Sequence, residues 1–221
     1  MIYTSLTLCT RFFDRRFYFI TGAYAAVVAA VIAAGAVLAG RGALAFIDHP
    51  LLALVSAAQN DTLVSVMRMI TALGGGTVMA GLSIVGVAWF LYRGMTVHAS
   101  ALATSVGGAA GVAAVMKWVL ERPRPSGFLA LQEHTFSFPS GHAALSLAFF
   151  GILVYFLLRH AQRLSVKIFA VAAGIIVVGA IGISRVYLGA HWPSDVIGSY
   201  ILVGAWLAIV IRHMERKCKE A

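Results

Sequence analysis

Long apolar runs constrain this chain more than any other feature of its sequence. Crossing the hydrocarbon core of a bilayer, about 30 Å thick, takes roughly 20 apolar residues. Six stretches approach or exceed that length, at residues 17–40, 74–92, 97–120, 140–158, 168–183 and 193–211. The mean hydropathy of +0.90 and the 11% of charged residues exclude a water-soluble domain. We therefore predict an all-α polytopic membrane protein, with residues 1–221 forming a single membrane-embedded domain of six transmembrane helices.

The segment between the first two spans has a different pattern. Residues 41–72 interrupt short apolar stretches with polar side chains, so we expect short helices at the membrane interface, with Asn60 or Asp61 as a helix cap. In the third span, Gly107 and Gly111 are expected to let another helix approach closely.

The basic residues predict the orientation. Six spans place both termini on one side, and with the N-terminus inside, eleven of the seventeen Lys and Arg residues lie on the inner side. We expect a multi-pass protein of the cell membrane, in a bacterium the inner membrane, with both termini in the cytoplasm. The formal net charge of +9 is largely assigned to this orientation, because no basic stripe with interleaved aromatic residues indicates nucleic acid binding. No feature indicates an obligate protein partner.

Three polar stretches interrupt the apolar second half of the chain. Ionisable groups beside lipid are costly, so their presence indicates a function. The six-span topology brings all three stretches to the outer face, where we expect them to converge. The stretches are Lys117 with Arg124-Pro125, then Pro139-Ser140-Gly141-His142, and then a short loop with Ser184, Arg185, His191 and Asp195.

The cations among these residues indicate a phosphate site. Lys117, Arg124 and Arg185 would make a triply cationic pocket, since arginine offers a planar fork to phosphate oxygens and lysine a point charge. Ser140 and Gly141 open a predicted helix whose free backbone N–H groups suit an anion.

The two histidines indicate catalysis at that phosphate. Pro193 suits the first position of a helix, which places Asp195 in its first turn, close enough to orient His191. The other ring nitrogen of His191 is then free to attack phosphorus, while His142 protonates the departing oxygen. Asp195 could instead pair with an arginine. The carboxylates are scattered without metal-ligand spacing, so we expect no metal and no cofactor.

These motifs resemble those of the type 2 phosphatidic acid phosphatase superfamily. The resemblance rests on Lys117-x6-Arg124-Pro125, on Pro139-Ser140-Gly141-His142 and on Ser184-Arg185-x5-His191-x3-Asp195, and every specified position matches. It implies six spans with an outer-face site, His191 forming a phosphohistidine, Asp195 orienting it and His142 acting as general acid. It also implies that the phosphoryl oxygens are held by Lys117, Arg124, Ser140, Gly141 and Arg185.

The sequence therefore predicts an integral membrane phosphohydrolase acting on lipid phosphates or diphosphates, such as phosphatidate, phosphatidylglycerophosphate, undecaprenyl diphosphate or lipid A. Its expected partners are the lipid substrate and membrane lipids. A phosphate-binding or lipid-transport protein remains an alternative, as does a vanadate-dependent oxidase, and Lys117 and Arg124 could merely snorkel from helix ends. Glu133 and His134 are interpreted as a solvated loop that could touch a head group.

Overall fold

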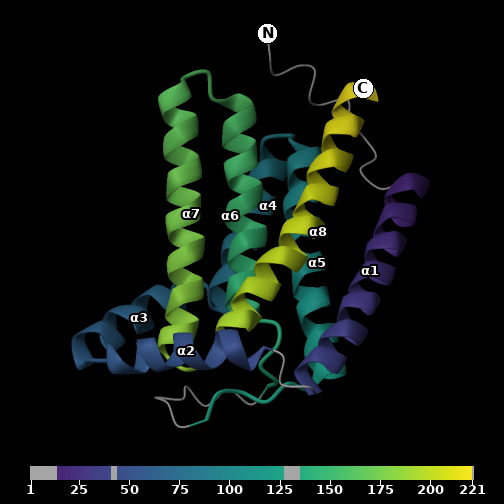
Figure 1. The fold of residues 1–221 in the computed structure, drawn as a ribbon. Coiled ribbons are helices and arrows are strands. Elements are labelled where there is room, and N and C mark those ends of the chain that lie inside the picture. The colour runs from purple at the N-terminus through teal and green to yellow at the C-terminus, as the bar shows by residue number, and fades with distance from the viewer. Residues whose placement is uncertain (1–13, 41–43, 127–134, 221) are drawn as a thin grey trace.

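The computed structural model describes residues 14–40, 44–126 and 135–220, and its regular structure is helical in all of them (Figure 1). The helices are α1 (Arg15–Gly40), α2 (Ala45–Ala57), α3 (Asp61–Leu73), α4 (Gly76–Tyr92), α5 (Thr96–Leu120), α6 (Gly141–His160), α7 (Leu164–Tyr187) and α8 (Pro193–Glu220).

The predicted all-α polytopic architecture is confirmed. Five stretches of the described chain are long and apolar enough to cross a membrane, and the first of them joins α3 and α4. The other four correspond to α5, α6, α7 and α8. Helix α1 has 26 mainly apolar residues, about 39 Å at 1.5 Å per residue, which is long enough for the first predicted span, at residues 17–40.

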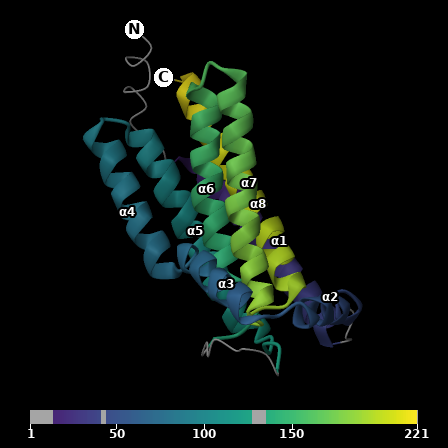
Figure 2. The same ribbon diagram turned by 90° about the vertical axis from the view of Figure 1, so that its left-hand side faces the viewer.

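Two shorter helices occupy the interval predicted to be interfacial. Helix α2 lies across one end of the bundle, and α3 leads obliquely into α4 (Figures 1 and 2). Asn60 caps α3, because its side-chain oxygen accepts a hydrogen bond from the Leu63 backbone N–H at 2.9 Å. The predicted cap is therefore confirmed.

The core is built around α6, which packs against α4, α5, α7 and α8. Small residues allow the close contacts, but the predicted positions were wrong. Gly107 and Gly111 have open space where a Cβ would lie, whereas a Cβ on Gly108 would lie 2.3 Å from the Trp206 ring of α8. Successive side chains point in directions about 100° apart around a helix, so Gly107 and its neighbour Gly108 face different surroundings.

The two ends of the described chain lie at the same end of the bundle (Figure 1). Asp14, just before α1, forms ion pairs of 2.9 Å with Arg216 and Lys217 near the end of α8. The three polar stretches lie at the opposite end, together with α2, so their predicted convergence is confirmed as convergence at one end of the bundle.

Candidate active site

A left-handed turn at the end of α7 places His191. Gly189 has φ of +66°, a conformation that costs glycine nothing, and behind it the N–H groups of Ala190 and His191 donate to the Arg185 carbonyl at 3.0 and 3.3 Å. The chain thereby folds back on its own helix end, and His191 is only 1% exposed. Ser184 and Arg185 belong to the last turn of α7, so the prediction that they share a loop with His191 was wrong.

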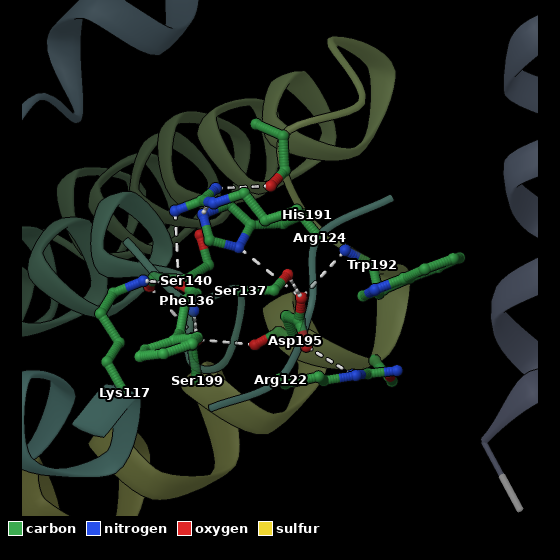
Figure 3. Close-up of polar contacts among 12 residues, drawn as sticks. Lys117, Arg122, Arg124, Phe136, Ser137, Ser140, His191, Trp192, Asp195 and Ser199 are labelled. Carbon is green, nitrogen blue, oxygen red and sulfur yellow. Dashed lines mark hydrogen bonds and ion pairs between the residues drawn. The ribbon is translucent and has the colours of Figure 1, made fainter. Parts of the chain in front are cut away.

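The next helix places the carboxylate opposite His191. Pro193 is the first residue of α8 and Asp195 lies in its first turn, as predicted. Asp195 Oδ2 accepts hydrogen bonds from the Trp192 N–H at 3.0 Å and from the Ser137 hydroxyl, and it lies 3.6 Å from His191 Nδ1 (Figure 3). That distance is longer than a hydrogen bond, and the contact becomes an ion pair only when the imidazole carries a positive charge.

Asp195 also pairs with an arginine, which was the alternative that the sequence left open. Its Oδ1 accepts from Arg122 Nη1 at 2.5 Å. One carboxylate therefore serves both partners, with Oδ1 toward Arg122 and Oδ2 toward His191 (Figure 3). The two interpretations of Asp195 are compatible in this geometry.

The surroundings of His191 favour its neutral form. Burial lowers the pKa of His191 below its ordinary value, and the guanidinium groups of Arg124 and Arg185 lower it further, although the Asp195 carboxylate opposes the shift. A neutral imidazole keeps a lone pair on one ring nitrogen, which is what a nucleophile requires. The nitrogen on the side away from Asp195 is Nε2, and it lies 3.4 Å from Arg124 Nη1.

The three predicted phosphate-binding cations come from three parts of the chain. Arg124 is anchored by backbone carbonyls, including those of Ala190 and Thr135 at 2.6 Å. Lys117, on the last turn of α5, donates to the Phe136 carbonyl at 2.5 Å, and Arg124 Nη2 reaches the same oxygen at 3.3 Å. These contacts hold the two cations side by side.

Arg185 approaches from the end of α7. It is only 1% exposed, its Nη1 donates to the Thr71 hydroxyl of α3 at 2.9 Å, and its carbonyl holds the His191 turn. The structure thus brings all three cations into contact with the turn at His191 or with the loop that precedes α6.

The second motif opens α6 beside the same group. Ser140 is the N-cap of α6, and its backbone N–H donates to the Ser199 hydroxyl of α8 at 2.8 Å. Its own Oγ is buried and makes no hydrogen bond with any described residue. Gly141 is the first helical residue, and a Cβ there would meet nothing within 4 Å. An unsatisfied hydroxyl beside an open helix N-terminus is an arrangement that suits an anion.

His142 lies in the first turn of α6 and is half-buried. Its ring is next to the junction of α3 and α4, because a Cβ on Gly74 would lie 3.4 Å from His142 Cδ2. Its role as general acid stays a prediction. Glu133 and His134 lie outside the described residues.

Several polar groups of this site were not predicted from the sequence. Arg122, Ser137 and Ser199 all contact Asp195, and Arg122 also pairs with Asp48 of α2 at 2.6 Å. The repeated Arg-Pro pair at residues 122–125 was a signal for Arg122. Asp48 had none beyond being a carboxylate in an apolar neighbourhood. Within the described residues, no group of three or more His, Cys, Asp or Glu side chains could hold a metal ion.

Comparisons with known proteins agree with these motifs. The model of the PAP2 superfamily matches residues 98–219, which include all three polar stretches. Phosphatidylglycerophosphatase B of Bacillus subtilis is 36% identical over 157 residues, 70% of this chain and 76% of that protein. Undecaprenyl-diphosphatase of Sulfolobus acidocaldarius is 33% identical over 107 residues, 46% of this chain and 47% of that protein.

Solved structures have the same fold. The crystal structure of a transmembrane PAP2 type phosphatidylglycerolphosphate phosphatase from Bacillus subtilis matches with a TM-score of 0.76 and 27% identity, covering 86% of this chain and 96% of the other. LpxE of Aquifex aeolicus matches with a TM-score of 0.56 and 22% identity, over 76% of this chain and 95% of the other, and this likeness concerns the fold alone.

Proposed function

The chain belongs to the PAP2 superfamily, and from that premise we propose that it removes the terminal phosphate from a lipid phosphate or lipid diphosphate at the membrane surface. The observation that carries this proposal is the position of His191. It lies in the turn between α7 and α8, 3.6 Å from Asp195 Oδ2 and 3.4 Å from Arg124 Nη1. Its buried, neutral imidazole is suited to attack phosphorus.

In the first step, His191 Nε2 attacks phosphorus and forms an N–P bond while the ester or anhydride P–O bond breaks. Lys117, Arg124 and Arg185 neutralise the charge on the phosphoryl oxygens, and the Ser140 hydroxyl and the α6 N-terminus donate hydrogen bonds to them. His142 gives its proton to the departing oxygen.

In the second step, His142 takes a proton from water, the resulting nucleophile attacks the phosphohistidine, and the N–P bond breaks. Inorganic phosphate leaves and His191 returns to its starting form. The ion pair between Asp195 and His191 Nδ1 stabilises the positive charge that the imidazole carries in the intermediate. The cations supply the charge neutralisation that a metal ion provides in other phosphatases.

The names of the relatives suggest the order in which to test substrates. The relative that matches over 70% of this chain is a phosphatidylglycerophosphatase, so phosphatidylglycerophosphate comes first. Undecaprenyl diphosphate comes second, after the shorter match. The lipid chain would remain in the bilayer beside the helices while the phosphate enters the site.

The proposed location is the outer face of the cell membrane, in a bacterium the periplasmic face of the inner membrane. The end of the bundle opposite the site carries an excess of Lys and Arg over the site end, and such an excess marks the cytoplasmic side. Accessibility of single cysteines to an impermeant thiol reagent in intact cells tests this orientation.

The experiment that tests the function is phosphate release by the purified protein in detergent. The panel holds phosphatidylglycerophosphate, undecaprenyl diphosphate, phosphatidate and lipid A, with the His191→Ala variant beside the wild type. We expect release from at least one lipid that depends on His191. Binding of inorganic phosphate without release from any lipid would instead support a phosphate-binding or transport protein.

A further inference from the structure

A chain of partly buried ionic contacts connects the interfacial helix α2 to the candidate catalytic carboxylate. Asp48 lies on the first turn of α2, in the segment predicted to be interfacial, yet it is only 1% exposed. Its Oδ2 accepts from Arg122 Nη2 at 2.6 Å, and Arg122 Nη1 donates to Asp195 Oδ1 at 2.5 Å. One guanidinium group therefore bridges two carboxylates that are 147 positions apart, from 48 to 195.

Ser194 closes this network at the start of α8. Its backbone N–H donates to Asp48 Oδ1 at 2.9 Å, and its hydroxyl donates to Asp48 Oδ2 at 2.8 Å while accepting from Arg122 Nη1 at 2.8 Å. Both oxygens of Asp48 are thus satisfied. Burying a carboxylate costs several kcal/mol unless it is paired in this way. These contacts therefore hold the Asp48 carboxylate in a defined orientation.

The network restricts the rotation of the Asp195 carboxylate. Arg122 holds Oδ1, so Oδ2 must face the Trp192 N–H, the Ser137 hydroxyl and His191. Arg122 is itself fixed because its second Nη is held by Asp48. Without Asp48, the guanidinium could turn about its side chain, and Asp195 would lose the contact that sets its orientation.

We propose that Asp48 is a positioning residue for phosphoryl transfer, which acts through Arg122 on Asp195 and makes α2 a part of the active site. This inference rests on the proposed function. It assigns to Asp48 no contact with substrate, so its effect falls on the chemical step. In the alternative role, the ion pairs only fasten α2 to the bundle, and the experiment separates the two roles.

The test is a double-mutant cycle with Asp48→Asn, Arg122→Gln and the double variant. Asparagine retains the size of Asp48 and an oxygen for Ser194 but removes the charge that holds Arg122. We expect Asp48→Asn to lower kcat by about tenfold or more with little change in KM. The double variant should be no slower than Arg122→Gln alone, because the charge that Asp48→Asn removes acts on Asp195 through Arg122.

The control is Asp61→Asn, which changes an exposed carboxylate in the first turn of the neighbouring helix α3. It should leave kcat unchanged. Asp48→Asn with wild-type kcat would overturn the proposal, and so would losses of kcat from Asp48→Asn and Arg122→Gln that multiply in the double variant. A fall in folded protein with unchanged kcat per folded molecule would mean that the network only fastens α2.

A second readout does not depend on turnover. The ¹⁵N resonances of His191 in ¹⁵N-histidine-labelled protein, assigned with His191→Asn, report the ring's protonation and partner. We expect them to shift in Asp48→Asn and to stay in Asp61→Asn, and an unchanged His191 signal in Asp48→Asn would contradict the proposal. If the wild type released no phosphate from any lipid, the proposed function would fail, whereas this signal would still decide the role of Asp48.

Discussion

Ser140 offers a sharp test of the phosphate site, because its backbone N–H has a partner within the protein and its side-chain hydroxyl has none among the described residues. The backbone N–H is bound to Ser199, whereas the buried Oγ makes no hydrogen bond with any described residue. Replacing Ser140 by alanine removes only that Oγ. The variant therefore loses no hydrogen bond of the folded protein, and we expect its thermal unfolding temperature to stay at or slightly above that of the wild type.

The effect on activity should be large. A hydrogen bond to a charged group contributes about 1.5–3 kcal/mol, so losing one to a phosphoryl oxygen lowers kcat/KM by roughly 10- to 150-fold. The assay is phosphate release from the preferred lipid, normalised to folded protein.

Ser199→Ala is the matched control. The Ser199 hydroxyl accepts from the Ser140 N–H at 2.8 Å and donates to the Asp195 carbonyl at 2.7 Å. Its loss leaves a buried N–H unsatisfied, which costs about 1–3 kcal/mol of folding stability. If Ser140→Ala lowered the unfolding temperature and left kcat/KM unchanged, Ser140 would be a structural residue and its Oγ would not bind the phosphoryl group.

Three further predictions concern the acid limb, the helix packing and the metal requirement. Burial lowers the pKa of His191, so its imidazole stays neutral until the pH falls below the ordinary value near 6.5. The acid limb of the kcat/KM profile that persists when the substrate is changed should therefore lie below pH 6.5. An acid limb above pH 7 would contradict this. Gly108→Val would overlap the Trp206 ring and should cost about 1–3 kcal/mol in thermal unfolding, whereas Gly107→Ala, with open space at its Cβ, should not destabilise. A chelator should leave phosphate release intact, and a loss that magnesium restores would contradict the metal-free mechanism.

The sequence predicts the helices well where length and apolar character decide. The runs at 97–120 and 193–211 became α5 and α8, and the polar interval at 41–72 became α2 and α3. Local chemistry also predicted the Asn60 cap and the Pro193 helix start. The sequence did not predict which face of α5 contacts another helix. Apolar residues surround an intramembrane helix on all sides, so the pattern does not distinguish Gly107 from Gly108 as the contact position.

The candidate site was predicted as a set of residues but not as a network. Spacing identified His191 and Asp195, while the bridge from Asp48 through Arg122 depends on the tertiary fold. A carboxylate on a short helix has no local signal for a partner 74 positions away. The end of α7 was also misplaced, because Ser184 and Arg185 are polar yet remain helical, with buried partners in the bundle.

Capture of the phosphorylated enzyme tests most directly whether His191 is the nucleophile. The protein is mixed with a lipid substrate carrying ³²P in its terminal phosphate, quenched in alkali within one turnover, and mapped by peptide. We expect an acid-labile label on the peptide that contains His191, and none in His191→Ala. Turnover by the wild type with no label, or phosphate release that survives in His191→Ala, would contradict it.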